Sequence, residues 1–307
     1  MQPIVVLSFG RSGSTWISDI ISKNLGGLLL FEPLHPETCP FAPEACYSDG
    51  YTLDDRLADF LHTILAKQDH NRWLLRNHLF SPLEEVSQAY LEMVWRESRV
   101  LGFKEIRANF MIDWLIERLD ARIVYLVRHP AAVIASLRRR VNFWKEFGFE
   151  THWQLFLQHV ADNPRHEEVL APYRSLIHGA RGQIEREAVM WAVSHKLATA
   201  ALARHGLPTF FYEDFYEYPY PTTRRLIQYV GGDPQAIHPA HIFVPSMTTI
   251  RTVHGLTSSE SDFAAKGWAI FWEDVLTQAE LDEIMAIVRA FELEDYRELF
   301  RAPKTQA

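Results

Sequence analysis

Cysteine is scarce in this chain of 307 residues, which has only Cys39 and Cys46, on either side of a proline-rich segment. Two cysteines cannot form a disulfide framework for a protein of this length. One disulfide between them stays possible, but reduced thiols in a cytoplasmic protein are the favoured interpretation.

Long apolar runs are also missing. No stretch approaches the roughly 18 uninterrupted apolar residues of a membrane-spanning helix. The first residues lead directly into a predicted strand, without the charged and then apolar start of a secretory signal. No Asn-x-Ser/Thr sequon with a permitted middle residue occurs. These absences predict a soluble, cytoplasmic protein with no membrane segment.

Positive charge is not in excess, because 31 lysines and arginines stand against 39 acidic residues, for a net charge of −8. A protein that coats nucleic acid needs surplus cations, so a nucleic-acid partner is not expected. A small basic pocket in an acidic surface stays possible. The 14 histidines show neither the His-Glu-x-x-His pattern nor paired-cysteine spacing, so no metal site is predicted.

Apolar runs and amphipathic stretches alternate along the chain, which predicts an α/β protein with a mostly parallel sheet flanked by helices. We expect a single domain over residues 1–307, with loop insertions over the site near residues 33–52 and 237–265. The expected strands are Ile4–Ser8, Gly27–Leu30, Arg99–Phe103, Arg122–Val127 and Pro208–Tyr212. The expected helices are Ser14–Asn24, Leu53–Gln68, Leu83–Trp95, Asn109–Leu119, Pro130–Arg140, Ile184–His205, Tyr220–Val230 and Gln278–Phe291.

The loop after the first strand carries the most information about function. Ile4–Ser8 leads into Gly10-Arg11-Ser12-Gly13, and a predicted helix starts at Ser14. A strand–loop–helix turn of this kind directs main-chain N–H groups and the positive end of a helix dipole at one point, which suits a phosphate. The alternative is an ordinary Gly/Ser turn.

This loop differs from the G-x-x-x-x-G-K-[ST] pattern that binds ATP or GTP. Gly10 and Gly13 are only three residues apart, no lysine precedes Ser14-Thr15, and Arg11 is the one cation of the loop. A Mg²⁺-dependent triphosphatase is therefore disfavoured. A metal-free cradle for a phosphate or phosphosulfate group is favoured.

A second motif follows the strand Arg122–Val127. Arg128 stands at the carboxyl end of that strand, where open α/β sheets bind their ligands, and Ser136 lies two turns into the next helix. A guanidinium offers a planar fork to a phosphate dianion, and a serine hydroxyl adds a donor. Alone, this pattern is slightly more typical of a surface arginine at a helix start.

Together the two motifs resemble the sulfotransferase family, which uses 3′-phosphoadenosine 5′-phosphosulfate (PAPS) as sulfate donor and has a P-loop-like fold. Arg11-Ser12-Gly13-Ser14-Thr15-Trp16 is similar to the loop that grips the 5′-phosphosulfate, with arginine where cytosolic members commonly have lysine. Arg128 and Ser136 have the eight-residue spacing of the family's 3′-phosphate pair.

The resemblance extends to the adenine and to a late loop. It implies that Tyr212, in Phe-Tyr-Glu-Asp, lies against the adenine and that Trp16 covers it, although either ring could simply pack in the core. Lys266-Gly267 resembles the family's late Arg-Lys-Gly loop at the 3′-phosphate, but Ala265 replaces the arginine. Arg251 is a candidate for the missing charge.

The resemblance also implies the catalytic residues. Arg11 would stabilise the sulfuryl oxygens, and Lys104 would contact the leaving oxygen. Glu32, in Glu-Pro-Leu-x-His, is the first candidate for the base and His35 the second. The alternatives are a strand-end Lys104 paired with Glu105, a salt bridge for Glu32 and an exposed turn for His35.

The expected reaction is transfer of a sulfuryl group to a hydroxyl of a sugar or small metabolite, by in-line displacement. Two other functions stay open: a PAP- or PAPS-binding regulator without turnover, and a kinase-like nucleotide transferase. The sequence names neither the acceptor nor the oligomeric state.

Overall fold

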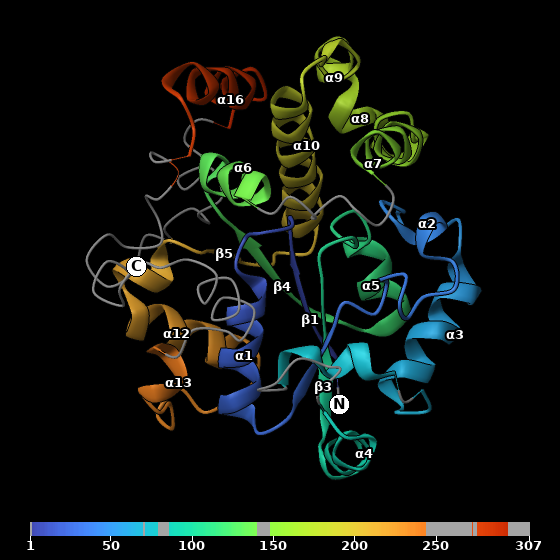
Figure 1. The fold of residues 1–307 in the computed structure, drawn as a ribbon, viewed down its shortest axis with the longest axis vertical. Coiled ribbons are helices and arrows are strands. Elements are labelled where there is room, and N and C mark those ends of the chain that lie inside the picture. The colour runs from blue at the N-terminus through green and yellow to red at the C-terminus, as the bar shows by residue number, and fades with distance from the viewer. Residues whose placement is uncertain are drawn as a thin grey trace.

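A parallel sheet forms the centre of the computed structural model, which describes residues 2–69, 71–78, 86–139, 148–243, 272 and 275–293. In these residues the sheet has five strands in the order β2-β3-β1-β4-β5 (Figure 1). The strands are β1 (Ile4–Ser8), β2 (Leu28–Phe31), β3 (Val100–Glu105), β4 (Arg122–Val127) and β5 (Thr209–Phe211). Every pairing is parallel, so all carboxyl ends meet at one edge. The predicted α/β fold with a parallel sheet is confirmed.

Two apolar layers bury the sheet, because successive side chains of a strand point to opposite faces. Val5 and Leu7 of β1 belong to a core with the helices α3 (Asp54–Leu65), α5 (Ile112–Leu119) and α10 (Gln183–Arg204). Ile4 and Val6 belong to a second core with the helices α1 (Ser14–Leu25) and α12 (Pro219–Tyr229). Figure 1 shows α1 and α12 on one side of the sheet and α3 and α5 on the other.

The predicted helices all have a counterpart in the described residues. They are α1 (Ser14–Leu25), α3 (Asp54–Leu65), α4 (Gln88–Glu97), α5 (Ile112–Leu119), α6 (Pro130–Arg139), α10 (Gln183–Arg204), α12 (Pro219–Tyr229) and α16 (Gln278–Ala290). Further elements that no pattern predicted are α2 (Ala42–Ala45), α7 (Phe149–Phe156), α8 (Glu167–Leu170), α9 (Arg174–Gly179), α11 (Asp214–Glu217), α13 (Ala240–Phe243), the short 3₁₀ helices η1 (Arg72–His78), η4 (Pro164–His166) and η5 (Ala171–Tyr173), and the short π-helix η3 (Leu157–Ala161).

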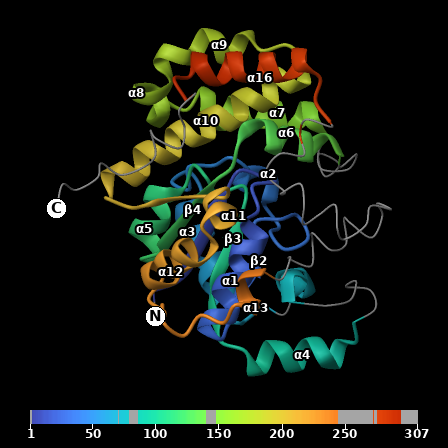
Figure 2. The ribbon, with the colours of Figure 1, turned by 90° about the vertical axis from the view of Figure 1, so that its left-hand side faces the viewer.

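Several of these helices gather beyond the carboxyl edge of the sheet. Figure 2 shows α7, α8, α9, α10 and α16 above the strands, with α4 at the opposite end of the molecule. The long helix α10 joins this group to the sheet, since Trp191 donates to the carbonyl oxygen of Arg128 at 3.1 Å. Helix α10 therefore supports the end of β4 where a ligand is expected.

The segment 33–52 was expected to be a loop over the site, and the structure buries much of it. Cys39, Phe41 and Cys46 lie in the larger core around the short helix α2. Both cysteines are free thiols, and burial raises the pKa of Cys39 to about 11. Of the second expected insertion, 237–265, residues 244–265 lie outside the described residues.

Candidate functional site

The loop between β1 and α1 has the backbone of an anion cradle. Arg11 and Gly13 both have left-handed conformations, with φ of 69° and 89°. Gly13 is the N-cap of α1, and the first helical hydrogen bonds run from the Trp16 and Ile17 N–H groups to the Gly13 carbonyl oxygen, so the N–H groups of Ser14 and Thr15 have no helical acceptor. The Ser14 hydroxyl accepts a hydrogen bond from Ser8 at 2.8 Å. Ser12 is buried, and its hydroxyl has no hydrogen-bond partner in the described part of the chain.

The two sequence motifs meet at this loop. Arg11 donates through Nε to Ser136 Oγ at 3.0 Å, and Arg128 donates through Nη1 to the carbonyl oxygen of Arg11, also at 3.0 Å. The contacts join residues more than a hundred positions apart, because β1 and β4 are neighbours in the sheet. Two guanidinium groups, a hydroxyl and the loop amides form a donor set that fits phosphate and sulfate oxygens.

Aromatic side chains extend the site from β4 toward β5. The Arg128 guanidinium lies 4.3 Å from the centre of the Tyr212 ring. Trp16 approaches Tyr212 edge-on with 5.8 Å between centroids, and Tyr216 lies 5.3 Å from Trp16. The Tyr212 ring also covers the loop between β1 and α1, since a Cβ on Gly13 would lie only 2.3 Å from a carbon of that ring. Tyr216, in α11, was not predicted as a site residue. Its position four residues after Tyr212 was the sequence signal that could have indicated it.

Not every predicted cofactor residue can be placed. Thr15 is half-buried in the first turn of α1, beside the loop. Lys266, Gly267 and Arg251 lie outside the described residues, so their predicted 3′-phosphate contacts stay a prediction.

A buried ion-pair cluster occupies the carboxyl ends of β2 and β3. Lys104 pairs with Oε1 of Glu32, and Arg107 donates through Nη1 to Oε2 of the same carboxylate at 3.0 Å. The side chains of Lys104 and Glu32 are 4% and 8% exposed. The alternative of a Lys104–Glu105 pair is wrong, because Lys104 pairs with Glu32 at the end of the neighbouring strand. The alternative of a salt bridge for Glu32 is confirmed.

Charge decides the protonation of Glu32 in this cluster. Burial disfavours the carboxylate, but the charges of Lys104 and Arg107 and their hydrogen bonds outweigh burial and lower the pKa of Glu32 to about 2. Glu32 is therefore ionised at neutral pH. Its main chain has φ of 41°, a left-handed conformation that is costly for a residue with a side chain and is held by its surroundings.

His35 follows Glu32 in the same segment, and it contacts an aromatic side chain that no sequence pattern predicted. Its ring stacks on Trp73 of η1 with centroids 3.7 Å apart, and Arg76 lies 4.6 Å from the same indole. His35 is 5% exposed, so the alternative of an exposed turn is wrong. Its Nδ1 accepts from the Glu37 N–H at 3.1 Å, which in a neutral ring assigns the proton to Nε2.

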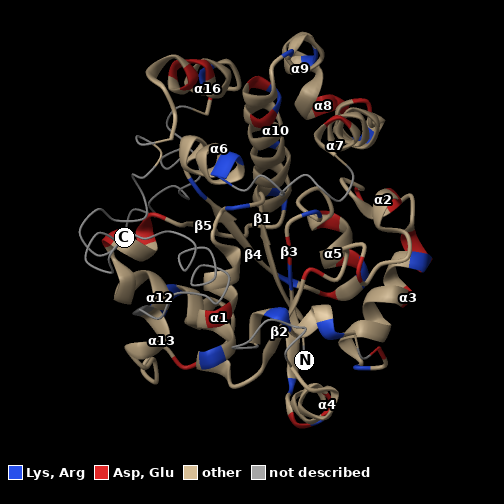
Figure 3. Cartoon of the chain, in the orientation of Figure 1, with Lys and Arg blue, Asp and Glu red and all other residues tan. Residues whose placement is uncertain are grey.

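The sheet order turns these groups into one continuous row. Along the carboxyl edge, whose strand order is β2, β3, β1, β4 and β5, Glu32 follows β2, and Lys104 lies one residue before the end of β3. Arg11, Arg128 and Tyr212 follow β1, β4 and β5. Cationic groups thus occupy the centre, aromatic rings one end and a carboxylate with a histidine the other. Acidic and basic residues are otherwise spread over many helices (Figure 3).

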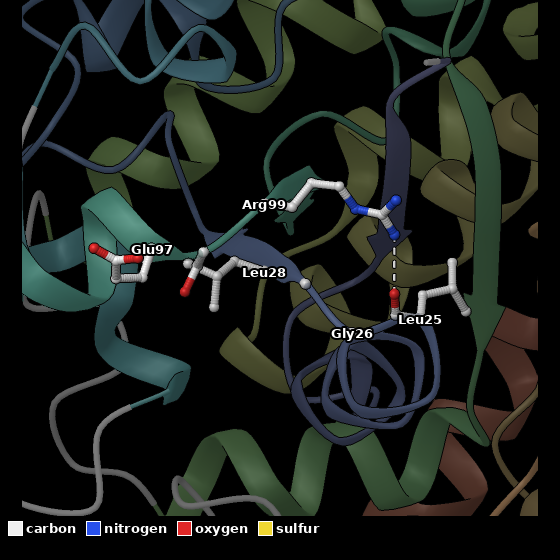
Figure 4. Close-up of a pocket in the computed structure, with 7 residues that line it drawn as sticks. Leu25, Gly26, Leu28, Glu97 and Arg99 are labelled. Carbon is white, nitrogen blue, oxygen red and sulfur yellow. Dashed lines mark hydrogen bonds between the residues drawn. The ribbon is translucent and has the colours of Figure 1, made fainter.

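Two surface cavities lie away from this row. The larger, of about 580 Å³, is lined by Leu28 at the start of β2 and by Arg99, which donates to the Leu25 carbonyl at 2.9 Å (Figure 4). It therefore opens at the amino edge of the sheet. The second, of about 310 Å³, lies between α5 and the end of α10 and includes Asp113 and Arg204. Neither is lined by a candidate residue.

Comparison with known proteins identifies the family. The model of the sulfotransferase family matches residues 3–233. The chain belongs to the sulfotransferase family. Family membership supports sulfuryl transfer in general as the activity, and it matches the resemblance seen in the two sequence motifs.

Solved structures give similar matches at low identity. A sulfotransferase domain from the Synechococcus PCC 7002 olefin synthase is 18% identical over 95% of this chain and 94% of that one, with a TM-score of 0.44. A sulfotransferase domain from the curacin biosynthetic pathway is 17% identical over 99% of both chains, with a TM-score of 0.46. A sulfotransferase from Alicyclobacillus acidocaldarius is 13% identical, over 94% of this chain and 96% of that one, with a TM-score of 0.38. A search of curated proteins gives no match.

Two further observations concern the described residues alone. Their histidine, cysteine and carboxylate side chains form no cluster of three or more that could hold a metal ion. None of their helices is long and apolar enough to span a membrane.

Proposed function

We propose that the protein transfers a sulfuryl group from PAPS to a hydroxyl acceptor, a sugar or a small metabolite. The observation that carries this proposal is the junction of Arg11, Ser136 and Arg128, which brings the predicted 5′-phosphosulfate and 3′-phosphate motifs into direct contact. A donor with two anionic groups and a flat base matches the order of β1, β4 and β5 along the edge.

In this arrangement the donor lies over β1, β4 and β5, and the acceptor approaches over β3 and β2. Arg11 and the loop amides bind the sulfuryl and phosphate oxygens. Arg128 and Ser136 bind the 3′-phosphate, and Tyr212 and Trp16 contact the adenine. Holding both reactants in line contributes most of the rate enhancement in such group transfers.

The reaction then breaks one bond and forms one. The acceptor oxygen attacks sulfur, the bond from sulfur to the bridging oxygen of the 5′-phosphate breaks, and PAP leaves with that electron pair. Lys104 stabilises the charge that develops on the bridging oxygen. The acceptor proton goes to a base on the β2 side.

Glu32 is the favoured base and His35 the second candidate. Glu32 is ionised at neutral pH, so it has a lone pair for the proton. Whenever the His35 ring is neutral, its proton lies on Nε2, because Nδ1 accepts from the Glu37 N–H, and Nε2 is then a donor toward the acceptor or the sulfuryl group.

The test is an acceptor screen with ³⁵S-labelled PAPS on the wild type and on Arg11→Ala, Glu32→Gln and His35→Ala. We expect wild-type transfer, with Glu32→Gln slower by about 10²–10⁴-fold. Full activity of Glu32→Gln together with loss in His35→Ala would assign the base to His35. Tight PAP binding without transfer to any acceptor would instead support a PAP- or PAPS-binding regulator. Mg²⁺-dependent ATP turnover would support a kinase-like nucleotide transferase.

A further inference from the structure

Arg107 lies in the buried cluster but has no place in the predicted site. We propose that Arg107 is the positioning residue for Glu32, holding its carboxylate in place while Lys104 exchanges that carboxylate for the oxygens of the sulfate donor. This inference rests on the proposed function, and it names how the base becomes available.

The two oxygens of Glu32 are held by different cations. Oε1 receives Lys104 Nζ, and Oε2 receives Arg107 Nη1 at 3.0 Å. Because the contacts are separate, Lys104 can leave without releasing the carboxylate. Its departure opens Oε1 to the hydroxyl of an acceptor.

The two cations differ in what holds them. Lys104 is a point charge on a flexible stem, and besides Glu32 it lies 4.6 Å from the Phe31 ring. Arg107 is tied at its main chain and at its guanidinium to one further carboxylate, since Glu105 Oε1 accepts from the Arg107 N–H at 3.0 Å and from Nη1 at 3.4 Å. Arg107 is therefore the fixed partner and Lys104 the exchangeable one.

Glu105 fixes the surrounding main chain as well. Its Oε1 accepts from the Ile106 N–H at 2.8 Å, and its Oε2 accepts from the Leu34 N–H at 2.8 Å. The segment after β2, which carries Glu32 and His35, is thereby bonded to the segment after β3, which carries Arg107. The whole cluster keeps its shape when one lysine moves.

The charges that face Glu32 explain what the exchange does. They are the positive Lys104 and Arg107 and the carboxyl of Glu105. Before the exchange both cations stabilise the carboxylate, so Glu32 is a weak base. After it only Arg107 does, so the affinity of Glu32 for the acceptor proton rises at the moment the donor is bound.

The experiment measures kcat, the KM for PAPS and the pH profile of kcat in wild type, Arg107→Gln and Arg107→Lys, with PAP affinity by calorimetry. Arg118→Gln is the matched control, because Arg118 pairs with Asp54 at 2.9 Å on the surface of α5. We expect Arg107→Gln to lower kcat by about 10²-fold or more, with PAP affinity changed less than about threefold. The acid limb of kcat moves to higher pH, since Glu32 has lost a cation.

Arg107→Lys keeps the charge and loses the fork, so we expect partial recovery of kcat and of the wild-type acid limb. If Arg107→Gln does not fold, kcat and the acid limb of its pH profile in Arg107→Lys test the role of Arg107 on their own. An active wild type whose variants keep its kcat, or lose kcat and PAP affinity together with an unmoved acid limb, would overturn the role of Arg107. Absence of PAP binding and of transfer in the wild type would overturn the proposed function instead.

Discussion

The Arg11 guanidinium donates to the Ser136 hydroxyl across 3.0 Å, joining residues that stand 125 positions apart. Arg11 follows β1, and Ser136 lies about two turns into α6, the helix that follows β4. Since β1 and β4 are adjacent parallel strands, this hydrogen bond links the segments that follow their carboxyl ends. Two halves of a predicted donor site thus form one site.

The first prediction concerns this bond. Ser136→Ala removes the hydroxyl that orients Arg11 and that would contact the 3′-phosphate, so PAP affinity should fall by about 2–10-fold, the range for one hydrogen bond. Calorimetric titration measures it. Ser194→Ala is the control, because that buried hydroxyl bonds only to the Met190 carbonyl within α10 in the described part of the chain. Equal affinities in wild type and Ser136→Ala would show that the hydroxyl contributes nothing.

The sequence predicted the sheet well because buried parallel strands are nearly continuous apolar runs. It ended the third strand too early, at Phe103, whereas β3 reaches Glu105. Lys104 and Glu105 interrupt the apolar run, and their charges are compensated by Glu32 and Arg107, of which Glu32 is some seventy positions away. No local pattern reveals such compensation.

The same limit applied to the site. The anion loop and the Arg128–Ser136 spacing are local patterns, and sequence alone was enough to find them. Arg107 and Trp73 belong to a turn and to the short helix η1, which show no periodicity. Their importance comes from side chains of Glu32 and His35 that approach them only after folding.

The second prediction concerns Gly13. Alanine there has a strained φ and a Cβ 2.3 Å from the Tyr212 ring, so the loop or the ring must move. We expect a loss of stability and a fall in PAP affinity of about tenfold or more. Gly26→Ala is the matched control, at φ of 64° with no atom near its Cβ, and should cost about 1–2 kcal/mol of stability without changing affinity. Thermal unfolding and calorimetry compare the two, and equal PAP affinities would contradict the assignment of the loop.

The third prediction concerns Asp19 in α1. Burial raises the pKa of its carboxyl from 3.8 to about 7, against the nearby charge of Lys23. A raised folded-state pKa means that stability is full below about pH 4 and is lost as the pH rises through about 7. Asp19→Asn removes this loss.

The gain in unfolding free energy from Asp19→Asn should therefore be on the order of 2–3 kcal/mol larger at about pH 8.5 than at about pH 5. Urea unfolding at both pH values measures it. Asp59→Asn, on the exposed face of α3, should show no such difference. A gain independent of pH would mean that Asp19 does not titrate in this range.

The fourth prediction concerns Arg128. Arg128→Lys keeps the charge but loses the fork and its position over Tyr212, so PAP affinity should fall by about 10–100-fold. Affinity for AMP, which has no 3′-phosphate, should change much less. Arg122→Lys is the control, because Arg122 begins the same strand at the opposite edge and donates to the Tyr229 carbonyl. If the affinities for PAP and AMP fell by the same factor, Arg128 would not be the residue that binds the 3′-phosphate.

The central claim is that the junction of Arg11, Ser136 and Arg128 binds a nucleotide with a 3′-phosphate and a 5′-phosphosulfate. Calorimetric titration of the wild type with PAP and with AMP tests it most directly, because it requires no knowledge of the acceptor. We predict one PAP per chain, bound about 10²-fold more tightly than AMP, a difference of about 2.7 kcal/mol. No binding of PAP, or equal binding of PAP and AMP, would contradict the account.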